Sequence, residues 1–420
     1  MLTGGVVSGI TITNAGTGYT TAPAIAFSGG TVATAGTNPT GTGNATNFIV
    51  AGIQVTNPGS GYTSAPGVTF SSGTGTTATA NLPAVILGAA TTIGGTGDLY
   101  IQPGITGGSN TLTKIGLSTL FLNGANTYTG ATTVSVGVLF LNGSLTSSVT
   151  VGSQGALIHP GSITGNLTVQ SGGLDAPSAT PSLRPITGNY SLASCATWRV
   201  LLSGTAAGTQ YDQLTVSGSV TLGGALDVIV GSNLAPGSTF TILNKAGTAT
   251  TGTTFAGKAE NSTFVTTDGY TFRINYNAGT GNDIALTLIT TPIEQWRFAN
   301  FGSILNVGAG LDTADGDGDG TSNLMEYATK MNPALHDIVP VAAAKNGSGI
   351  DFTYNKNKAA TDVTFIVEWS DTLNGTDWST VGVGAPVILT DDGVTQQIKV
   401  TVAAGTGVSK RFVRLKVMRP

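Results

Sequence analysis

The chain has 420 residues, of which 62 are glycine and only 9% are charged. An average soluble protein carries roughly 25% charged residues, and the glycine, threonine and serine that replace them here favour strands and tight turns over helices. A net charge of −4 without a basic stripe gives no electrostatic footprint for nucleic acid, and the single cysteine, Cys195, excludes an intramolecular disulfide.

Charge is unevenly placed along the chain. Residues 1–97 contain no acidic, basic or histidine side chain, and before Arg184 only Asp98, Lys114 and Asp175 carry a full charge at pH 7. The last third of the chain is amply charged, so the sequence has two compositional halves. The first residues have neither a basic n-region nor an apolar h-region, and no apolar run reaches the roughly 18 residues of a membrane-spanning helix. No signal peptide is therefore visible, and no transmembrane segment is expected.

Residues 1–84 contain an internal repeat. The segment VSGITITNAGTGYTTAPAIAFSGG returns as VAGIQVTNPGSGYTSAPGVTFSSG at a constant offset of 43 residues, from Gly9 to Gly52 and from Tyr19 to Tyr62. A fixed period of this size marks a modular array. Alternating apolar residues on both sides of a Gly-x-Gly-Tyr turn predict one β-hairpin in each unit. The units resemble the glycine-tyrosine-proline β repeats of large bacterial surface proteins and of some phage tail proteins.

A second pattern follows in residues 111–142. It has a Leu-Thr-Lys-x-Gly start, a Leu-x-Leu-x-Gly-x-Asn-x-Tyr-x-Gly centre and a closing Gly-x-Leu-x-Leu. The matching positions are Leu112, Thr113, Lys114, Gly116, Leu120, Leu122, Gly124, Asn126, Tyr128, Gly130, Gly137, Leu139 and Leu141. This pattern resembles the autotransporter-associated β-strand repeat, and the resemblance implies a passenger β-helix and no catalytic chemistry.

Short apolar strands separated by glycine or asparagine turns recur around this repeat, as each coil of a β-solenoid requires. Examples are residues 120–122, 134–136, 138–141, 149–151 and 167–169. Residues 186–290 continue in the same style and resemble the segment that closes many such passengers. We therefore expect a β-solenoid with capping coils over residues 85–290.

The composition changes after residue 290. The sequence Thr-Pro-Ile-Glu from Thr291 combines an N-cap, an N1 proline and an N3 glutamate. This capping box predicts a short helix to about Asn300, with Ile293 and Trp296 buried. Residues 291–337 are expected to form a helical connector.

Residues 315–326, DGDGDGTSNLME, fit the twelve-residue calcium loop at every position, with Gly320 at the sharp turn. The predicted ligand positions are Asp315, Asp317, Asp319, Thr321, Asn323 and Glu326. Calcium is a hard cation that takes six to eight oxygen ligands, which three aspartates, the Thr321 carbonyl and a bidentate Glu326 can supply, with Asn323 acting directly or through water. The loop resembles the single EF-hand-like or dockerin-type repeats of secreted bacterial proteins.

An exit helix is expected after the loop. Leu324, Tyr327, Ala328 and Met331 follow a helical period, and Asn332-Pro333 is a stop signal. One unpaired loop should bind calcium with a Kd of about 10⁻⁴–10⁻³ M, the range of extracellular modules. Calcium is therefore predicted to be a structural cofactor.

Residues 338–420 have the alternation of a second β domain, expected to be a β-sandwich. The predicted strands are residues 351–354, 363–369, 397–402 and 412–417. The VEWSDTL and RFVRLKV segments resemble C-terminal modules of large secreted bacterial proteins. The basic residues of the last strand are expected to form a solvated edge that discourages edge pairing. They are Lys410, Arg411, Arg414, Lys416 and Arg419.

The sequence offers little for catalysis. Its two histidines, His159 and His336, lie in different regions, and it has no Walker P-loop, G-x-S-x-G elbow or G-x-G-x-x-G. A polysaccharide-degrading β-helix would need paired carboxylates. The conceivable members of such a pair are Asp212, Asp227, Asp268 and Asp283. Glycan binding through exposed aromatic residues is the stronger alternative, and its candidates are Tyr19, Tyr62, Tyr128, Trp198 and Trp378.

These observations predict an all-β chain with hairpin repeats, a central β-solenoid, a helical calcium-binding connector and a C-terminal sandwich. The expected function is that of a secreted or surface-exposed structural or adhesive protein of a bacterium, and not an enzyme. Because uncharged strand edges accept neighbouring strands, self-association into a fibre is expected. Glycans and other surface proteins are the further expected partners.

Overall fold

In the computed structural model, the described residues are 85–420 apart from 96, 248–252, 348, 374 and 406–409, together with the backbone of eight strands before residue 85. The chain divides into two compact units. The first comprises Met1–Ile229, Phe240–Ser262 and Ile274–Ala285, and the second Val230–Thr239, Thr263–Arg273 and Leu286–Pro420. The described part is mostly β, with two α-helices. The predicted predominance of strands is confirmed.

Some of the N-terminal strands pair between the two sequence repeats. They are β1 (Leu2–Thr3), β2 (Val6–Val7), β3 (Thr11–Asn14), β4 (Ala24–Ser28), β5 (Thr40–Thr46), β6 (Ile49–Asn57), β7 (Gly67–Ser71) and β8 (Thr79–Asn81). Strand β4 runs antiparallel to β7, its equivalent in the second repeat, with Ala26 opposite Thr69. The four-stranded sheet has the order β6-β5-β4-β7. The expected pattern of one separate hairpin per repeat is therefore not the pairing observed.

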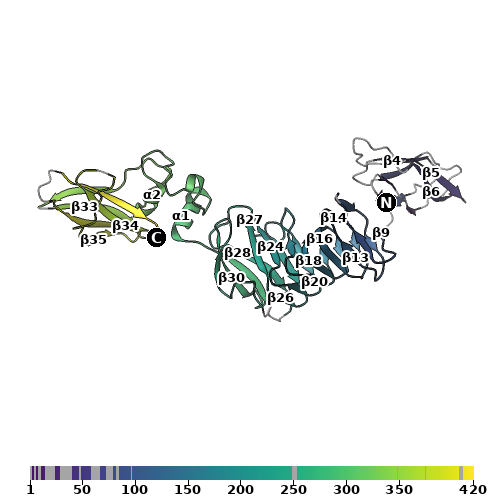
Figure 1. Cartoon of the computed structure of the whole chain (residues 1–420). Helices are drawn as coiled ribbons and strands as arrows, with labels where there is room; N and C mark the ends of the chain where they lie inside the picture. Colours follow the sequence, from purple (N-terminus) through teal and green to yellow (C-terminus); the bar gives the residue numbers. More distant parts are fainter. Residues whose placement is uncertain are drawn as a thin grey trace. The chain divides into compact units, whose positions relative to one another are not determined.

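A parallel β-solenoid follows, and Figure 1 shows its strands stacked coil upon coil. Its strands are β9 (Val85–Ile86), β10 (Thr91–Ile93), β11 (Leu99–Ile101), β12 (Ile105–Thr106), β13 (Leu112–Lys114), β14 (Thr119–Leu122), β15 (Ala125–Asn126), β16 (Thr132–Leu141), β17 (Ser144–Leu145), β18 (Val149–Ile158), β19 (Ser162–Ile163), β20 (Leu167–Val169), β21 (Leu174–Ala176), β22 (Leu183–Ile186), β23 (Tyr190–Leu192), β24 (Thr197–Leu202), β25 (Gln213–Val216), β26 (Val220–Leu222), β27 (Ala225–Val230) and β28 (Thr239–Lys245). Strands β29 (Thr263–Val265), β30 (Thr271–Ala278) and β31 (Asp283–Ile289) come next, and β29 pairs antiparallel with β30.

The interior of the solenoid is built from columns of buried side chains in register. One column consists of Leu112, Thr132, Val149, Leu167, Tyr190 and Val220, all 5% exposed or less. Alternation along each strand places these residues inside and their neighbours outside. The predicted solenoid is thus confirmed, and its coils bury apolar surface against one another as repeat architectures do.

The solenoid turns require glycine. The two strands predicted at 134–136 and 138–141 form one bent strand, β16, because Gly137 adopts a left-handed φ of 78° between them. At Gly143 an added Cβ would meet the Gly124 carbonyl oxygen at 2.0 Å, so successive coils approach too closely for any side chain. Gly137 therefore permits a bend in the strand, and Gly143 permits close stacking of the coils.

Three polar residues of the repeat motif make hydrogen bonds inside the solenoid. The Lys114 ammonium donates to the carbonyl oxygens of Ile115, Gly116 and Val136 at 2.8, 2.7 and 3.2 Å. Asn126 accepts from the Ile105 amide at 3.0 Å and donates to two further carbonyls, and the Tyr128 hydroxyl lies 2.7 Å from the Thr132 hydroxyl. All three motif residues are buried. Their role is to satisfy backbone and side-chain polar groups between coils.

A charged cluster is also buried in the solenoid. Asp175 accepts hydrogen bonds from Arg184 and from the Tyr190 hydroxyl at 3.1 Å, and it lies 3.3 Å from His159 Nε2. Burial and the Arg184 charge lower the pKa of His159. Although burial opposes ionisation of Asp175, the Arg184 guanidinium and His159 hold the pKa of Asp175 below its usual value. The cluster therefore contains one ion pair beside a neutral imidazole.

The C-terminal part combines two short helices with two sheets. Its elements are α1 (Pro292–Phe301), the 3-10 turn η1 (Gly308–Gly310), α2 (Asn323–Thr329), β32 (Val341–Asn346), β33 (Gly349–Asn357), β34 (Thr364–Ser370), β35 (Val387–Asp391), β36 (Thr395–Ala403) and β37 (Phe412–Met418). The antiparallel sheet β32-β33-β36-β35 and the pair β34-β37 share one apolar cluster, which includes Phe352, Val367 and Leu415. The four predicted strands are confirmed. Helix α1 begins at the predicted proline, and the Thr291 amide donates to the Glu294 carboxylate at 2.7 Å.

Candidate metal site

The loop of residues 315–326 is held at both ends by backbone hydrogen bonds. The Asn323 amide donates to the Ala314 carbonyl at 2.8 Å, and the Leu324 amide donates to the Asp312 carbonyl at 3.0 Å. Asp312 in turn accepts from the buried Arg297 of α1 and from Arg419 at 3.2 Å. The start of the loop is therefore fixed next to the first turn of α2.

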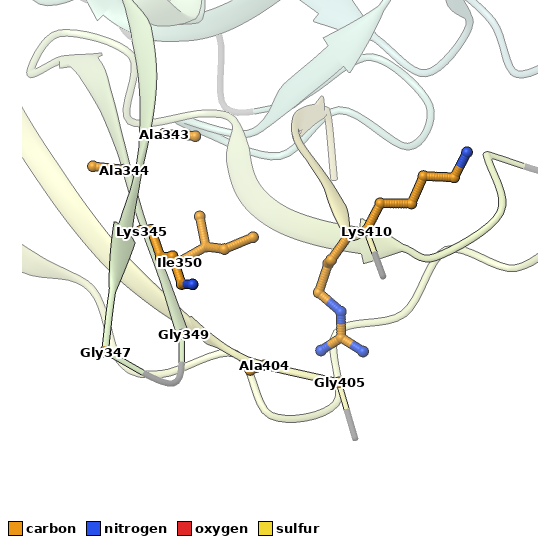
Figure 2. A pocket seen from close by; sticks show the side chains of 10 residues that line it. Ala343, Ala344, Lys345, Gly347, Gly349, Ile350, Ala404, Gly405 and Lys410 are labelled. Carbon is orange, nitrogen blue, oxygen red and sulfur yellow. The ribbon is translucent and has the colours of Figure 1, made fainter. Parts of the chain in front are cut away.

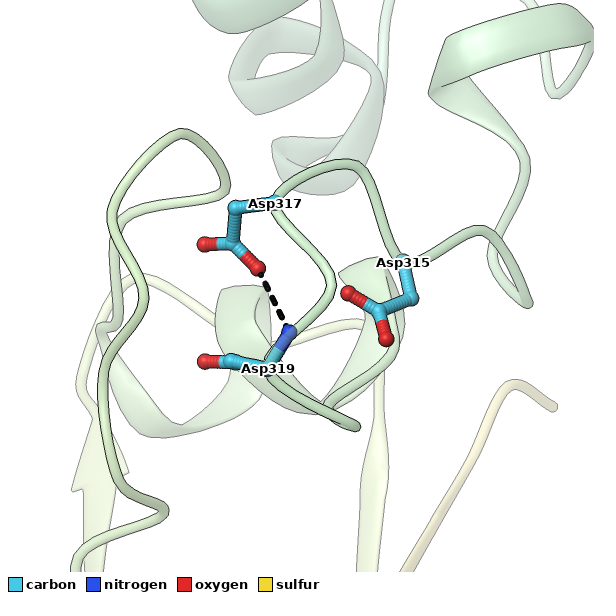
Figure 3. A group of neighbouring side chains, drawn as sticks. All are labelled: Asp315, Asp317 and Asp319. Atoms are coloured by element: carbon cyan, nitrogen blue, oxygen red, sulfur yellow. Dashed lines mark hydrogen bonds between the residues drawn. The ribbon is translucent and has the colours of Figure 1, made fainter.

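Three loop aspartates gather their carboxylates in one place. An oxygen of each of Asp315, Asp317 and Asp319 lies within 4.8 Å of the others, and Figure 3 shows Asp317 and Asp319 side by side with Asp315 facing them. Asp315 accepts from the amides of Gly318 and Gly320 at 2.8 and 2.9 Å. Gly320 has a φ of 88°, so the predicted sharp turn at this position is confirmed.

The other predicted ligand residues are buried beside this cluster. Glu326 and Asn323 are each 1% exposed, and Thr321 is 5% exposed. The Thr321 amide donates to Asp319 at 2.7 Å. The Asn323 side-chain nitrogen donates to the carbonyls of Ala309 and Leu311, both at 2.7 Å. The Asn323 side-chain oxygen takes no part in these two bonds.

Four buried acceptor oxygens at this site have no hydrogen-bond donor among the described residues. They are Asp317 Oδ2, Asn323 Oδ1 and both oxygens of Glu326. Burial raises the pKa of Glu326 to about 7, with further contributions from the charges of Asp317, Asp319, Asp315 and Asp337. Buried oxygens of native proteins normally have partners, and an unpaired buried carboxylate is costly. A set of acceptors without a donor is the arrangement that a hard cation satisfies, so the residues present fit calcium.

Helix α2 connects this loop to the C-terminal sheets. Its Tyr327 hydroxyl donates to Asp362 at 2.5 Å, and Asn357 of β33 donates to the Tyr327 carbonyl at 2.9 Å. Tyr327 is buried with Ile293 and Ala360 in one cluster. The helix ends at Thr329 and not at Met331, the last residue of the apolar period, because Lys330 takes a left-handed φ of 67°.

The four carboxylates considered for catalysis each have a structural partner. Asp212 accepts from the amides of Ser182 and Leu201 at 2.9 and 2.8 Å. The other partners are Arg199 for Asp227 at 2.7 Å, the Val230 amide for Asp268 at 3.4 Å and the Lys245 amide for Asp283 at 2.8 Å. Each of these four carboxylates therefore accepts a hydrogen bond from a residue elsewhere in the fold.

Two of the aromatic residues considered for glycan binding are buried. Tyr128 is 0% and Trp198 is 1% exposed, so the prediction that they are exposed is wrong. Trp198 lies in β24, where alternation turns it inward with Val200 and Leu202. Trp378 is partly exposed and carries the Arg414 guanidinium 3.8 Å above its ring. Tyr19 and Tyr62 lie outside the described residues.

A pocket in the C-terminal part is lined mainly by small residues (Figure 2). It lies between the β32-β33 connection and the segment after β36, and none of the ten residues drawn along it is acidic. One lining residue, Arg411, makes a two-pronged ion pair with Asp371 at 2.8 and 2.9 Å. The pocket lining therefore lacks the paired carboxylates of a glycosidase.

Several basic residues near the C-terminus make ion pairs with acidic partners. Besides Arg411, Arg414 and Lys416 pair with Glu368 at 2.8 and 3.7 Å. Strand β37 pairs with β34, and its basic side chains contribute ion pairs to that sheet. The Arg414 and Lys416 side chains nevertheless remain 43% exposed, so this strand carries solvated basic side chains as expected.

Comparison with known proteins bears on the solenoid. The Passenger-associated-transport-repeat family matches residues 112–139, which lie within strands β13 to β16. No curated protein matches the chain. Neither helix of the described part is long and apolar enough to cross a membrane. The repeat and the solenoid around it support the resemblance to a passenger β-helix, and together they indicate an autotransporter-type passenger surface protein.

Proposed function

We propose that this chain is an extracellular structural or adhesive segment of a bacterial surface protein, acting as a stalk or a fibre subunit. The observation that carries this proposal is the passenger-associated repeat inside a parallel solenoid. Lys114, Asn126 and Tyr128, the distinctive polar residues of that repeat, are buried in coil-to-coil hydrogen bonds. In this proposal the repeat builds the solenoid and performs no chemistry, so the purified chain should turn over no member of a broad panel of polysaccharides.

Calcium is the proposed structural cofactor of residues 315–326. Supporting this are the three gathered aspartates and the four buried oxygens without a donor. If the Kd is about 10⁻³ M, a free calcium concentration about ten times the Kd would stabilise the folded state by about 1.4 kcal/mol through mass action. The stabilisation falls on the second compact unit, which contains the loop.

Isothermal titration calorimetry and thermal unfolding test the calcium proposal. Millimolar calcium should release or absorb heat and raise the Tm, and Glu326→Gln should abolish both effects. Glu294→Gln is the matched control, because Glu294 serves the N-terminus of α1 and a glutamine can still accept its hydrogen bond. Equal behaviour of the wild type with and without calcium would contradict the proposal.

We further propose that the chain forms fibres through its uncharged N-terminal repeats. Residues 1–97 have no charged side chain to block strand addition at an edge. Contacts of this kind that do not close into a ring propagate as filaments. Negative-stain microscopy of the concentrated protein, with and without residues 1–80, should show filaments only when the repeats are present. Discrete particles in both samples would leave a monomeric stalk or adhesin, whose partners are glycans or other surface proteins.

A further inference from the structure

The chain returns to the candidate metal loop after helix α2. Lys330 ends the helix with a left-handed φ of 67°, and residues 330–340, here called the return segment, then pass along the loop. A Cβ added at Gly316 would lie 3.3 Å from the Pro333 carbonyl oxygen, so the two segments are in contact. The Asp337 amide donates to Asp319 Oδ2 at 3.0 Å. Asp337 is thus brought to the loop although it lies outside the twelve-residue motif.

Beyond the buried Pro333, the return segment has little apolar anchoring. Leu335 is 56% and Ile338 is 91% exposed, so the apolar residues on both sides of Asp337 face solvent. Burial of these side chains contributes little to holding the segment. Beyond the bonds of the Lys330 and Met331 amides to the Glu326 carbonyl at the helix end, the Asp337 amide attaches this stretch to the loop.

The site toward which Asp337 is brought contains acceptors without donors. Glu326 is 1% exposed, and within the part of the chain that the structure describes neither of its oxygens has a partner. The charge of Asp337 is one of four aspartate charges that act on the Glu326 carboxylate. A further carboxylate near these acidic side chains is repelled by them unless a cation is present. Calcium binds oxygen ligands in flexible geometry and can therefore include one from the return segment.

We infer that Asp337 supplies an additional carboxylate to the calcium site, so that calcium fastens the return segment to the loop. This inference rests on the proposed calcium function. Because the return segment leads directly into β32, calcium would also fix the start of the C-terminal sheet. The site then joins three consecutive pieces of chain, which are the loop, α2 and the return segment.

The test is calcium titration of the full chain carrying Asp337→Asn. The asparagine keeps the backbone amide that bonds Asp319 and removes only the charge. Loss of a supporting carboxylate should weaken calcium binding by about tenfold or more. Asp392→Asn is the matched control, since Asp392 lies in the β35-β36 turn and an asparagine can still accept from the Thr395 amide. The control should bind calcium like the wild type.

Limited proteolysis reports on the fastening. Lys330 and Leu335 are exposed, so trypsin and chymotrypsin can cleave at the two residues. Calcium should protect both positions in the wild type, and Asp337→Asn should need about tenfold more calcium for equal protection.

If the wild type binds calcium and Asp337→Asn binds it equally well, the inference is overturned and the loop site stands. If calcium binds without protecting the return segment, the fastening is overturned. If the wild type binds no calcium, both proposals fail.

Discussion

The buried lysine of the solenoid repeat offers a direct test of how the repeat motif stabilises the fold. Lys114 is 1% exposed, and its ammonium donates to three backbone carbonyls of two neighbouring coils. Lys114→Met keeps an unbranched apolar side chain of similar length and removes the charge and the three donors. The substitution therefore tests the hydrogen bonds separately from the packing.

The expected loss of stability follows from two opposing effects. A hydrogen bond to a charged group contributes about 1.5–3 kcal/mol, and a buried acceptor left without a donor costs about 1–3 kcal/mol. Burial lowers the pKa of Lys114, which means that desolvation of the ammonium offsets part of this gain. Ile115 is 42% exposed, so its carbonyl can find water in the variant. A net loss of about 2 kcal/mol remains.

Hydrogen exchange measured by mass spectrometry detects this loss locally, which matters because a chain of two units need not unfold in one step. Peptides from residues 112–141 should exchange about 30-fold faster in Lys114→Met, since 1.4 kcal/mol corresponds to a tenfold change. Lys358→Met is the control, because Lys358 makes an exposed ion pair with Asp391 at 2.9 Å and such pairs contribute about 0–1 kcal/mol. Exchange in Lys114→Met within about threefold of the wild type would refute the reasoning.

Four further predictions concern titration and the α2 contact. Calcium affinity should fall by up to about tenfold per pH unit as the pH drops below the Glu326 pKa of about 7, because protons and calcium compete for the same carboxylate. Calorimetry at several pH values measures this change, and a constant Kd would contradict the prediction. Without calcium, the raised pKa of Glu326 means that this residue contributes stability to the folded state at pH 4.5, and that the contribution is lost as the pH rises through 7. His159 should have the opposite effect on stability, because its pKa is lowered in the fold. The stability that it contributes above its unfolded pKa of 6.5 should be lost as the pH falls. Hydrogen exchange of the solenoid coils should show this loss in the wild type, and His159→Gln should reduce it. Tyr327→Phe should cost about 1–3 kcal/mol by leaving an Asp362 oxygen without its donor, and a Tm equal to the wild type would exclude that contribution.

Much of the fold follows from patterns that are local in sequence. Alternation along residues 120–122 and 149–151 predicts strands whose inward residues are buried, and the structure confirms them. Strands β32 and β35 could not be anticipated in this way, because every residue in both is exposed and their sequences do not alternate. Their place in the sheet depends on backbone pairing with β33 and β36.

The candidate site shows the same division. The loop residues from Asp315 to Glu326 are recognisable because their spacing is fixed by one local motif. Asp312, Arg297 and Asp337 carry no such signal, since tertiary contacts bring them to the loop. For Trp198 a signal existed, because it alternates in β24 with Val200 and Leu202, and that alternation already implies an inward side chain.

The two compositional halves correspond to two ways of satisfying polar groups. In the solenoid, parallel coils pair their backbones with each other, and neutral residues such as Asn126 and Thr132 complete the turns, so few charges are needed. Helices α1 and α2 and the loop between them have no neighbouring coil to pair with. Their polar groups depend on ion pairs such as Arg297 with Asp312 and, in our proposal, on calcium. Removing calcium should therefore loosen residues 291–337 and leave the solenoid coils unaffected, which follows because none of the loop carboxylates belongs to the first compact unit.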